Sequence, residues 1–350
     1  MFYGIAAAAT ALLATAALTA LLRVVARKTG FTVRRAGRIL RTPRLGGLAV
    51  ALVTATVITV GASTGLAPVG SGTLTLLIAA GAVAAIGLLD DARPTGARAR
   101  VAVVTAAATA VVHTAQLGFL VSMLAVLWIV FVTSVCRHFD TSDGVLGTVG
   151  VVTALGLSVC ASADGLGQLS GVLGLLAAAL TGFLMHNWHP ARMRLGSCGS
   201  LFTGFVLASA AVLVNVEHDA LTGAGSLFAV TFVVTADAAL VAVSRRLAGR
   251  PVLRPGPDHI AHRLRRLGLT PRGSAVVLGV ASLSGVVTAL LMHEGTLGPA
   301  AALGPLTVAA AAVAVLLRVP VHGVRETMHG VRERGARTVQ QPAAINVSGS

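Results

Sequence analysis

Two adjacent aspartates, Asp90 and Asp91, end a long uncharged stretch of the chain. This stretch, residues 71–89, is long enough to cross a bilayer, so both carboxylates are expected where a helix leaves lipid for water. A carboxylate pair at that depth is costly unless a cation neutralises it. Magnesium fits this description because it binds a few carboxylate oxygens and keeps its other positions for water and phosphate. A solvated pair at a helix end is the alternative, but it would oppose the helix dipole.

Two further acids, Asp140 and Asp143, follow another apolar stretch and are expected near the same membrane face. Asp140 alone could cap the next helix. Four carboxylates that return to one face are harder to explain without a cation, because like charges at short range repel. Asp140 and Asp143 are therefore candidates to complete an acidic, metal-binding cluster with the Asp90–Asp91 pair.

Several basic and hydroxyl-bearing segments could bind the phosphates of a substrate at this face. Arg44 precedes a glycine pair at an expected helix start, where backbone amides can approach an anion. Arg192 and Arg194 precede the turn Gly-Ser-Cys-Gly-Ser at 196–200, which enters another helix. Guanidinium groups suit phosphate, although ordinary anchoring to the inner leaflet explains basic loop residues equally well.

The last long connection adds two histidines, His259 and His262, three residues apart. If that segment is helical they share one face, and they could serve a diphosphate. A histidine pair in a basic loop is otherwise unremarkable. Asp237 precedes them inside an apolar stretch, and an acid at that depth is a functional candidate. Pairing with Arg245 or with a backbone group accounts for Asp237 equally well.

The composition defines the scaffold that must position these residues. The chain has 350 residues, of which 55% are hydrophobic and 11% charged, with a mean hydropathy of +0.86. An ordinary soluble domain carries about 25% charged residues, so the sequence predicts an all-α polytopic membrane protein with about eleven transmembrane helices. The expected helices cover residues 3–22, 46–63, 71–89, 101–117, 118–136, 144–162, 167–186, 201–216, 224–244, 274–292 and 296–317.

The charged residues predict how this bundle is oriented. With alternating spans, all 27 Lys and Arg residues fall in connections on one side, which the positive-inside rule makes cytoplasmic. The N-terminus is then outside and the C-terminus inside. The net charge of +15 needs no nucleic-acid partner, since the membrane explains it. Three cysteines without paired spacing indicate neither a disulfide framework nor a zinc site.

Three regions are expected along the chain. Residues 1–317 form a single transmembrane domain whose cytoplasmic loops carry the site. Residues 318–337, with the repeat His-Gly-Val-Arg-Glu, are expected to form a basic amphipathic helix on the inner leaflet. Residues 338–350 are expected to be a disordered tail.

Between residues 41 and 269 the chain resembles the UDP-sugar:polyprenyl-phosphate sugar-1-phosphate transferases. This superfamily contains phospho-N-acetylmuramoyl-pentapeptide transferase and polyprenyl-phosphate N-acetylglucosamine-1-phosphate transferase. The similarity lies in five elements in register: residues 43–47 (Pro-Arg-Leu-Gly-Gly), 88–91 (Leu-Leu-Asp-Asp), 187–200, Asp237 and 258–269.

The chain departs from the family pattern at four positions. Ser197 stands where the family has an aspartate expected to bind magnesium, and Leu146 stands where it has a second acid. Asp140 replaces an asparagine, and Ala261 replaces a histidine. Most of these changes remove a metal ligand or a phosphate contact.

The resemblance implies an enzyme of the bacterial plasma membrane, with its active site facing the cytoplasm. It would use Mg²⁺ to move a sugar 1-phosphate from a UDP-sugar, such as UDP-N-acetylglucosamine, to polyprenyl phosphate, releasing UMP for cell-wall or surface-glycan synthesis. Catalytic roles are implied for Asp90, Asp91 and Asp143. Metal binding is implied for Asp91, Asp140 and Asp143. Phosphate or nucleotide contacts are implied for Arg44, Asn187, Arg192, His259 and His262.

Two other functional interpretations are compatible with the sequence. One is a catalytically degenerate relative that acts as a membrane scaffold or as a partner that binds lipid phosphate. A transporter is weaker, because the hydropathy shows no inverted repeat and no broken spans at matching positions. A homodimer is compatible with the sequence.

Overall fold

The computed structural model describes residues 2–28, 34–35, 38–39, 42–67, 69–251, 256 and 258–319. Apart from a two-residue hairpin, β1 (Arg34–Arg35) with β2 (Arg38–Ile39), the described secondary structure is helical. The helices are α1 (Phe2–Lys28), α2 (Gly46–Ser63), α3 (Ser71–Ala92), α4 (Ala97–Thr114), α5 (Phe119–Phe139), α6 (Val145–Ala163), α7 (Gly167–Asn187), α8 (Gly196–Val214), α9 (Ala220–Leu247), α10 (Ile260–Arg266), α11 (Pro271–His293), the 3-10 turn η1 (Pro299–Ala302) and α12 (Leu303–Leu317).

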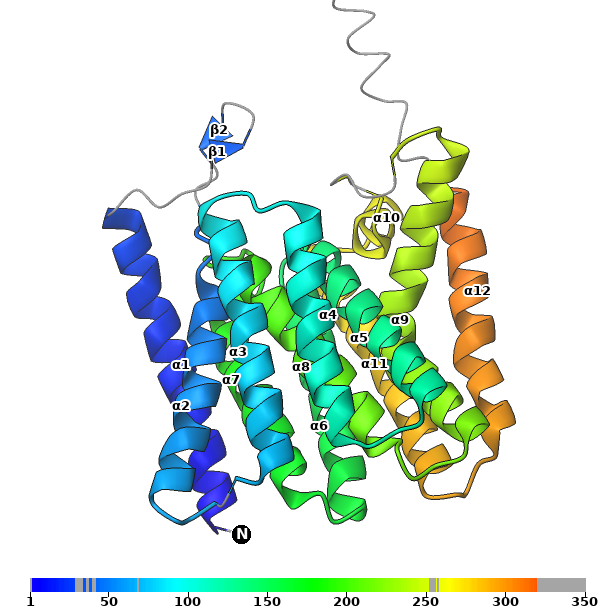
Figure 1. Ribbon diagram of the computed structural model, residues 1–350. Helices are drawn as coiled ribbons and strands as arrows, with labels where there is room; N and C mark the ends of the chain where they lie inside the picture. Colours follow the sequence, from blue (N-terminus) through cyan, green and yellow to red (C-terminus); the bar gives the residue numbers. More distant parts are fainter. Residues whose placement is uncertain are drawn as a thin grey trace, which may run out of the picture.

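The long helices run side by side as one bundle (Figure 1). Ten helical segments in the described chain are long and apolar enough to cross a membrane. The remaining long helix, α4, packs beside α3 and α5 but carries two arginines in its first turn. The predicted all-α polytopic membrane protein is therefore confirmed. The short α10 lies in the last long connection and begins directly after His259.

The helix α8 is the centre of the bundle and contacts α2, α3, α5 and α6. Almost all of its side chains are buried, whereas other spans expose apolar side chains on their outer faces, as lipid contact requires. It begins at Gly196, five residues before the predicted start. The predicted turn at 196–200 is thus the first turn of a central span.

Small residues let two helices approach the start of α8. A Cβ atom on Gly47 of α2 would lie 2.1 Å from the Cα of Gly199, and one on Gly87 of α3 would lie 2.6 Å from the carbonyl oxygen of Ser197. Backbones this close tolerate only glycine. The predicted anion-binding amides of Gly46 and Gly47 instead donate to the carbonyls of Arg194 and Leu195. The glycine pair therefore joins α2 to α8.

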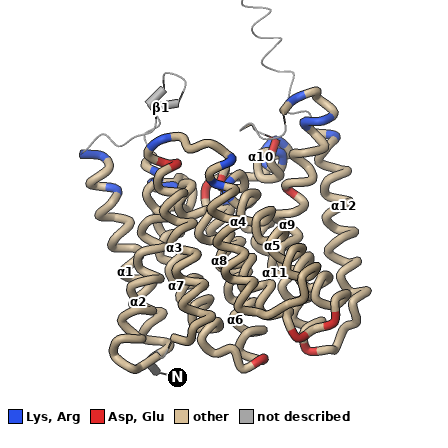
Figure 2. The backbone as a smooth tube through the Cα atoms, viewed as in Figure 1, with Lys and Arg blue, Asp and Glu red and all other residues tan. Residues whose placement is uncertain are grey.

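Charge is distributed unevenly along the bundle axis (Figure 2). The described Lys and Arg residues gather at the end where α3 and α5 finish and α8 begins, whereas Asp164, Glu217, Asp219 and Glu294 lie in connections at the opposite end. This separation agrees with the predicted pattern of connections. Except for its first two residues, the predicted amphipathic helix at 318–337 lies outside the described residues, as does the predicted tail at 338–350.

Candidate functional site

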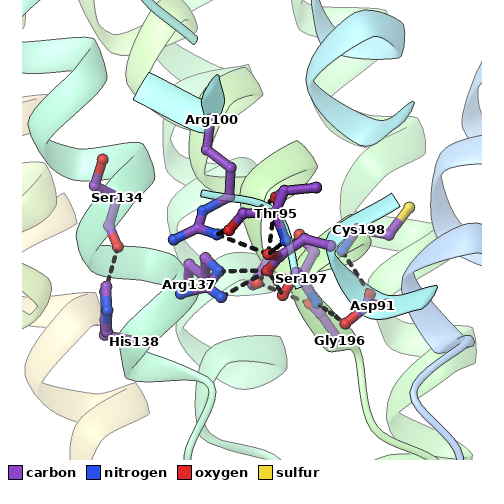
Figure 3. Close-up of polar contacts among 11 residues, drawn as sticks. Asp91, Thr95, Arg100, Ser134, Arg137, His138, Gly196, Ser197 and Cys198 are labelled. Atoms are coloured by element: carbon purple, nitrogen blue, oxygen red, sulfur yellow. Dashed lines mark hydrogen bonds and ion pairs between the residues drawn. The ribbon is translucent and has the colours of Figure 1, made fainter. Parts of the chain in front are cut away.

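The candidate site lies at the basic end of the bundle, around the start of α8 (Figure 3). Asp90 and Asp91 are in the last turn of α3, Asp140 is the residue after α5, and Ser197 is the second residue of α8. The glycine contacts described above press α3 against this turn. Residues more than 100 positions apart are thereby brought within hydrogen-bond distance.

The carboxylate of Asp90 is paired with two arginines. Arg100 Nη1 lies 2.7 Å from Oδ1, and Arg137 Nη2 lies 2.6 Å from Oδ2. The backbone and hydroxyl of Thr95 donate to Oδ1, and the hydroxyl of Ser197 donates to Oδ2 at 2.9 Å. Only 4% of the Asp90 side chain is exposed. Both of its oxygens are therefore occupied by donors from the chain itself.

The carboxylate of Asp91 caps the start of α8. Its Oδ1 accepts from the Ser197 amide and its Oδ2 from the Cys198 amide, both at 2.9 Å. A carboxylate is stabilised at this position by the free N–H groups and by the helix dipole. The amides predicted to be available to a phosphate therefore already bind Asp91.

Asp140 and Asp143 flank the same turn. Asp140 accepts from the Gly196 amide at 3.3 Å, and burial raises the pKa of Asp140 to about 7 against the opposing effects of Arg194, of this amide and of Arg44. Asp143 accepts from the imidazole of His189 at 2.9 Å and from the Ala191 amide at 3.2 Å. Asp143 is 22% exposed and so is reachable from solvent.

This arrangement does not fit the magnesium site that the resemblance implies. Mg²⁺ takes carboxylate oxygens whose lone pairs are free to coordinate it. Asp90 is bound by two guanidiniums, Asp91 by two amides, and Ser197 offers a hydroxyl that donates to Asp90. Among the described residues, no three His, Cys, Asp or Glu side chains are grouped so that they could hold a metal ion. The predicted ligands Asp91, Asp140 and Asp143 are thus near one turn without forming a metal centre.

The predicted phosphate-binding residues differ in how accessible they are. Arg192 is exposed, and Arg44 is half-buried beside Asp91 and Asp140, whose carboxylates it affects electrostatically. Asn187 is buried, and its amide accepts from Gly144 N–H at 2.9 Å and donates to Met193 C=O at 2.8 Å. The Asn187 side chain therefore joins two loops of the site and has little capacity left for a ligand.

The two predicted histidines belong to a neighbouring network. His259 is buried, and its Nδ1 lies 2.6 Å from Asp237 Oδ2, while the Ile260 amide donates to the other oxygen of Asp237. Asp237 thus pairs with a histidine and a backbone amide, as the second reading of this residue anticipated, although the partner is not Arg245. His262 is half-buried, and burial lowers its pKa.

Comparison with known proteins identifies the family. The family model described as glycosyl transferase family 4 matches residues 73–215. The chain is 50% identical over 338 residues to a Streptomyces coelicolor protein provisionally named a glycosyltransferase, covering 95% of this chain and 82% of that one. It is also 30% identical over 247 residues to phospho-N-acetylmuramoyl-pentapeptide-transferase of Moorella thermoacetica, covering 62% of this chain and 74% of that enzyme. The chain belongs to glycosyl transferase family 4.

A third relative in this family is decaprenyl-phosphate N-acetylglucosaminephosphotransferase of Mycolicibacterium smegmatis, which is 29% identical over 280 residues and 68% covered in each chain. The family resemblance inferred from the motifs is therefore confirmed. Relatives of this chain are phosphotransferases, and the apolar helices make it a multi-pass membrane protein.

Sequence reasoning missed the residues that bind Asp90. Arg100 and Arg137 were counted only as markers of the cytoplasmic side, and Ser197 was interpreted as a lost ligand. A signal for Arg137 was present, because it is a lone basic residue directly before the acids of the third loop. No local pattern indicates that Arg100 of α4 and Arg137 of α5 meet at one carboxylate.

Proposed function

We propose that this family 4 protein transfers a sugar 1-phosphate from a UDP-sugar to polyprenyl phosphate at the cytoplasmic face of the bacterial membrane. An oxygen of the lipid phosphate attacks the β-phosphorus of the UDP-sugar. The bond from that phosphorus to the bridging oxygen breaks, and UMP leaves with the bridging oxygen and its electron pair. The product is a lipid-linked sugar diphosphate for cell-wall or surface-glycan synthesis.

One observation carries this proposal beyond family membership. Guanidinium groups from two loops and two helices surround the first turn of α8, where Arg44, Arg100, Arg137 and Arg194 each lie close to one of the acids. Both reactants are anions, so a site for this reaction must supply positive charge at the point where they meet. The turn lies at the end of a span, where a lipid phosphate and a soluble nucleotide can reach the same place.

The Asp143–His189 pair is the part of this site best placed to contact the attacking phosphate. The two side chains are 22% and 38% exposed, and Asp143 Oδ2 holds His189 Nδ1 at 2.9 Å. A histidine oriented by a carboxylate presents its other ring nitrogen to solvent or substrate. In the proposed reaction His189 positions the attacking phosphate, and Asp143 fixes the imidazole.

The test is direct transfer by the purified protein in lipid vesicles. UDP-N-acetylglucosamine labelled on its β-phosphate is mixed with undecaprenyl phosphate, with and without Mg²⁺, and labelled lipid and free UMP are measured. Transfer of label into lipid, matched by UMP release and reduced at least about tenfold by Asp143→Asn, is expected. A panel of other UDP-sugars then identifies the donor. The matched control is Asp164→Asn, at the opposite end of the bundle.

A second candidate function is favoured by the occupied carboxylate of Asp90. A family 4 relative whose Asp90 is bound by two arginines could keep the lipid-phosphate site and lose the chemistry. It would act as a scaffold or as a partner that binds lipid phosphate. Binding of undecaprenyl phosphate without UMP release from any UDP-sugar in the panel would establish this function and refute the transferase.

A further inference from the structure

The two arginines at Asp90 use only part of their hydrogen-bonding capacity. Arg100 donates from Nη1 to Asp90 and to the Thr95 carbonyl, and Arg137 donates from Nε and Nη2 to Asp90. Within the described part of the chain, Nε and Nη2 of Arg100 and Nη1 of Arg137 have no hydrogen-bond partner. An arginine has five N–H donors, so each of these side chains keeps an unused edge.

The same two side chains remain accessible to water. Arg100 is 16% exposed and Arg137 is 24% exposed, whereas the carboxylate between them is 4% exposed. A ligand that approaches from solvent therefore meets guanidinium edges before it meets the carboxylate. Thr95 and Ser197 donate to the same carboxylate and fix it between the two arginines.

The charges at this point favour an anion. Two guanidiniums and one carboxylate leave an excess of one positive charge at Asp90, and the neighbouring carboxylate, Asp91, is turned to the first turn of α8, where it accepts from two amides. A divalent cation would be repelled by both arginines. A phosphate, in contrast, matches the planar fork of a guanidinium. Its hydrogen bonds are also stronger when the donor is charged, as it is here.

We infer that Arg100 and Arg137, oriented by Asp90, bind a substrate phosphate directly and without a metal ion. Asp90 is then a positioning residue, and the two arginines supply the positive charge at this site. The ligand class is a phosphate monoester or diphosphate, which both polyprenyl phosphate and a UDP-sugar contain. Only the identity of that phosphate rests on the proposed function.

Binding is tested with the full-length protein in lipid nanodiscs. The probes are UDP in water and undecaprenyl phosphate incorporated in the nanodisc, and each is titrated in EDTA and again with Mg²⁺. We expect both conditions to give the same affinity for the probe that occupies the site. Arg137→Gln and Arg100→Gln should each weaken that affinity about tenfold. Arg98→Gln is the matched control, because Arg98 is an exposed arginine in the same first turn of α4.

The two probes distinguish the sources of the phosphate. Weakened UDP binding alone assigns the arginines to the nucleotide, and weakened lipid binding alone assigns them to the polyprenyl phosphate. Arg137→Lys keeps the charge but loses the fork, so its affinity should lie between those of the wild type and of Arg137→Gln. If Arg137→Gln does not fold, the lysine variant and the comparison of EDTA with Mg²⁺ still decide.

The inference is overturned if both probes bind the wild type only with Mg²⁺, or if both glutamine variants bind both probes as the wild type does. Failure of the proposed function looks different. Metal-independent, arginine-dependent binding without any sugar-phosphate transfer would support the inference and refute the transferase. Transfer that needs Mg²⁺ and is unaffected by Arg137→Gln would do the reverse.

Discussion

Two ion-pair networks lie at the same end of this bundle, and they differ in how fully the chain itself occupies an arginine at their centre. The fifth-loop network, in and beside the connection between α9 and α11, consists of Asp237, Arg245, Asp258, His259 and Arg263. Its Arg263 donates from all three of its nitrogens, to Ser244, to the Asp258 carbonyl and to the carbonyls of Leu316 and Val319. In the Asp90 network, both arginines keep unused N–H groups among the described residues. Identical residue types thus close one network and leave the other open to a ligand.

The two networks also differ in how deeply their side chains are buried. Arg245 and Asp258 of the fifth-loop network are 4% and 3% exposed, and His259 and Asp237 are 4% and 1% exposed. The arginines at Asp90 are 16% and 24% exposed. A sealed network fixes α10 against α9 and α12, whereas an open network can exchange water for phosphate. The comparison therefore predicts that changes in the first network damage folding and that changes in the second damage binding.

The largest effect is expected for Arg263→Met. Methionine replaces the aliphatic part of the side chain but leaves several buried acceptors without donors, so the free energy of unfolding should fall by about 3 kcal/mol. Thermal unfolding in detergent, followed by circular dichroism, measures the change. Arg265→Met on the same helix is the control, because Arg265 is exposed. Equal unfolding temperatures for the two variants would show that the fifth-loop network does not support the fold.

A smaller loss of stability is expected for Asp90→Asn. The two guanidiniums lose their carboxylate but remain partly hydrated, so we expect a loss of about 2 kcal/mol in the free energy of unfolding. Phosphate binding should survive, since the variant has one negative charge fewer beside both arginines. Titration with UDP and undecaprenyl phosphate checks this. Complete loss of binding in a folded variant would show that the arginine pair cannot hold the ligand without the Asp90 carboxylate between its two side chains.

Ser197→Asp tests the Asp90 network by adding a second carboxylate beside Asp90. The new carboxylate would lie next to Asp90 Oδ2, where Ser197 now donates at 2.9 Å, and the two like charges would compete for Arg137. We expect a destabilisation of about 1 kcal/mol in EDTA, and a partial recovery on addition of Mg²⁺ that the wild type does not show. A stabilisation of the wild type by Mg²⁺ of the same size would contradict this account of the site.

The sequence predicted the bundle well because its spans are encoded locally, by length and by the absence of charge. It placed the start of α8 five residues late, because the polar segment at 196–200 has the composition of a turn. That segment becomes helical where Asp91, from another helix, accepts from the amides of Ser197 and Cys198. Contacts of this kind depend on tertiary packing and leave no local pattern.

The candidate site was likewise predictable only where it is encoded locally in the sequence. The sequence identified the acids and several arginines of the basic end, since those follow from loop position and from family motifs. It assigned the acids to a metal because the partners of Asp90 come from α4 and α5, and Arg137 lies 47 positions away. Which cation neutralises Asp90 is decided by helix packing, because α4 and α5 bring Arg100 and Arg137 to this carboxylate.

The smallest effect concerns pH and arises at Asp140, which lies beside the Asp90 network at the same turn of α8. Burial raises the pKa of Asp140 to about 7, whereas an unfolded aspartate titrates near about 3.9. The folded protein therefore holds a proton that the unfolded chain has lost between about pH 4 and pH 7, so stability falls as pH rises through this window and levels off above it. Because Asp140 is only partly shielded, we expect the unfolding temperature to change by no more than about 3 °C.

Asp140→Asn should flatten this dependence of the unfolding temperature on pH, and the same scan on Arg263→Met should keep it. A pH dependence that persists in Asp140→Asn would assign the titration to another group.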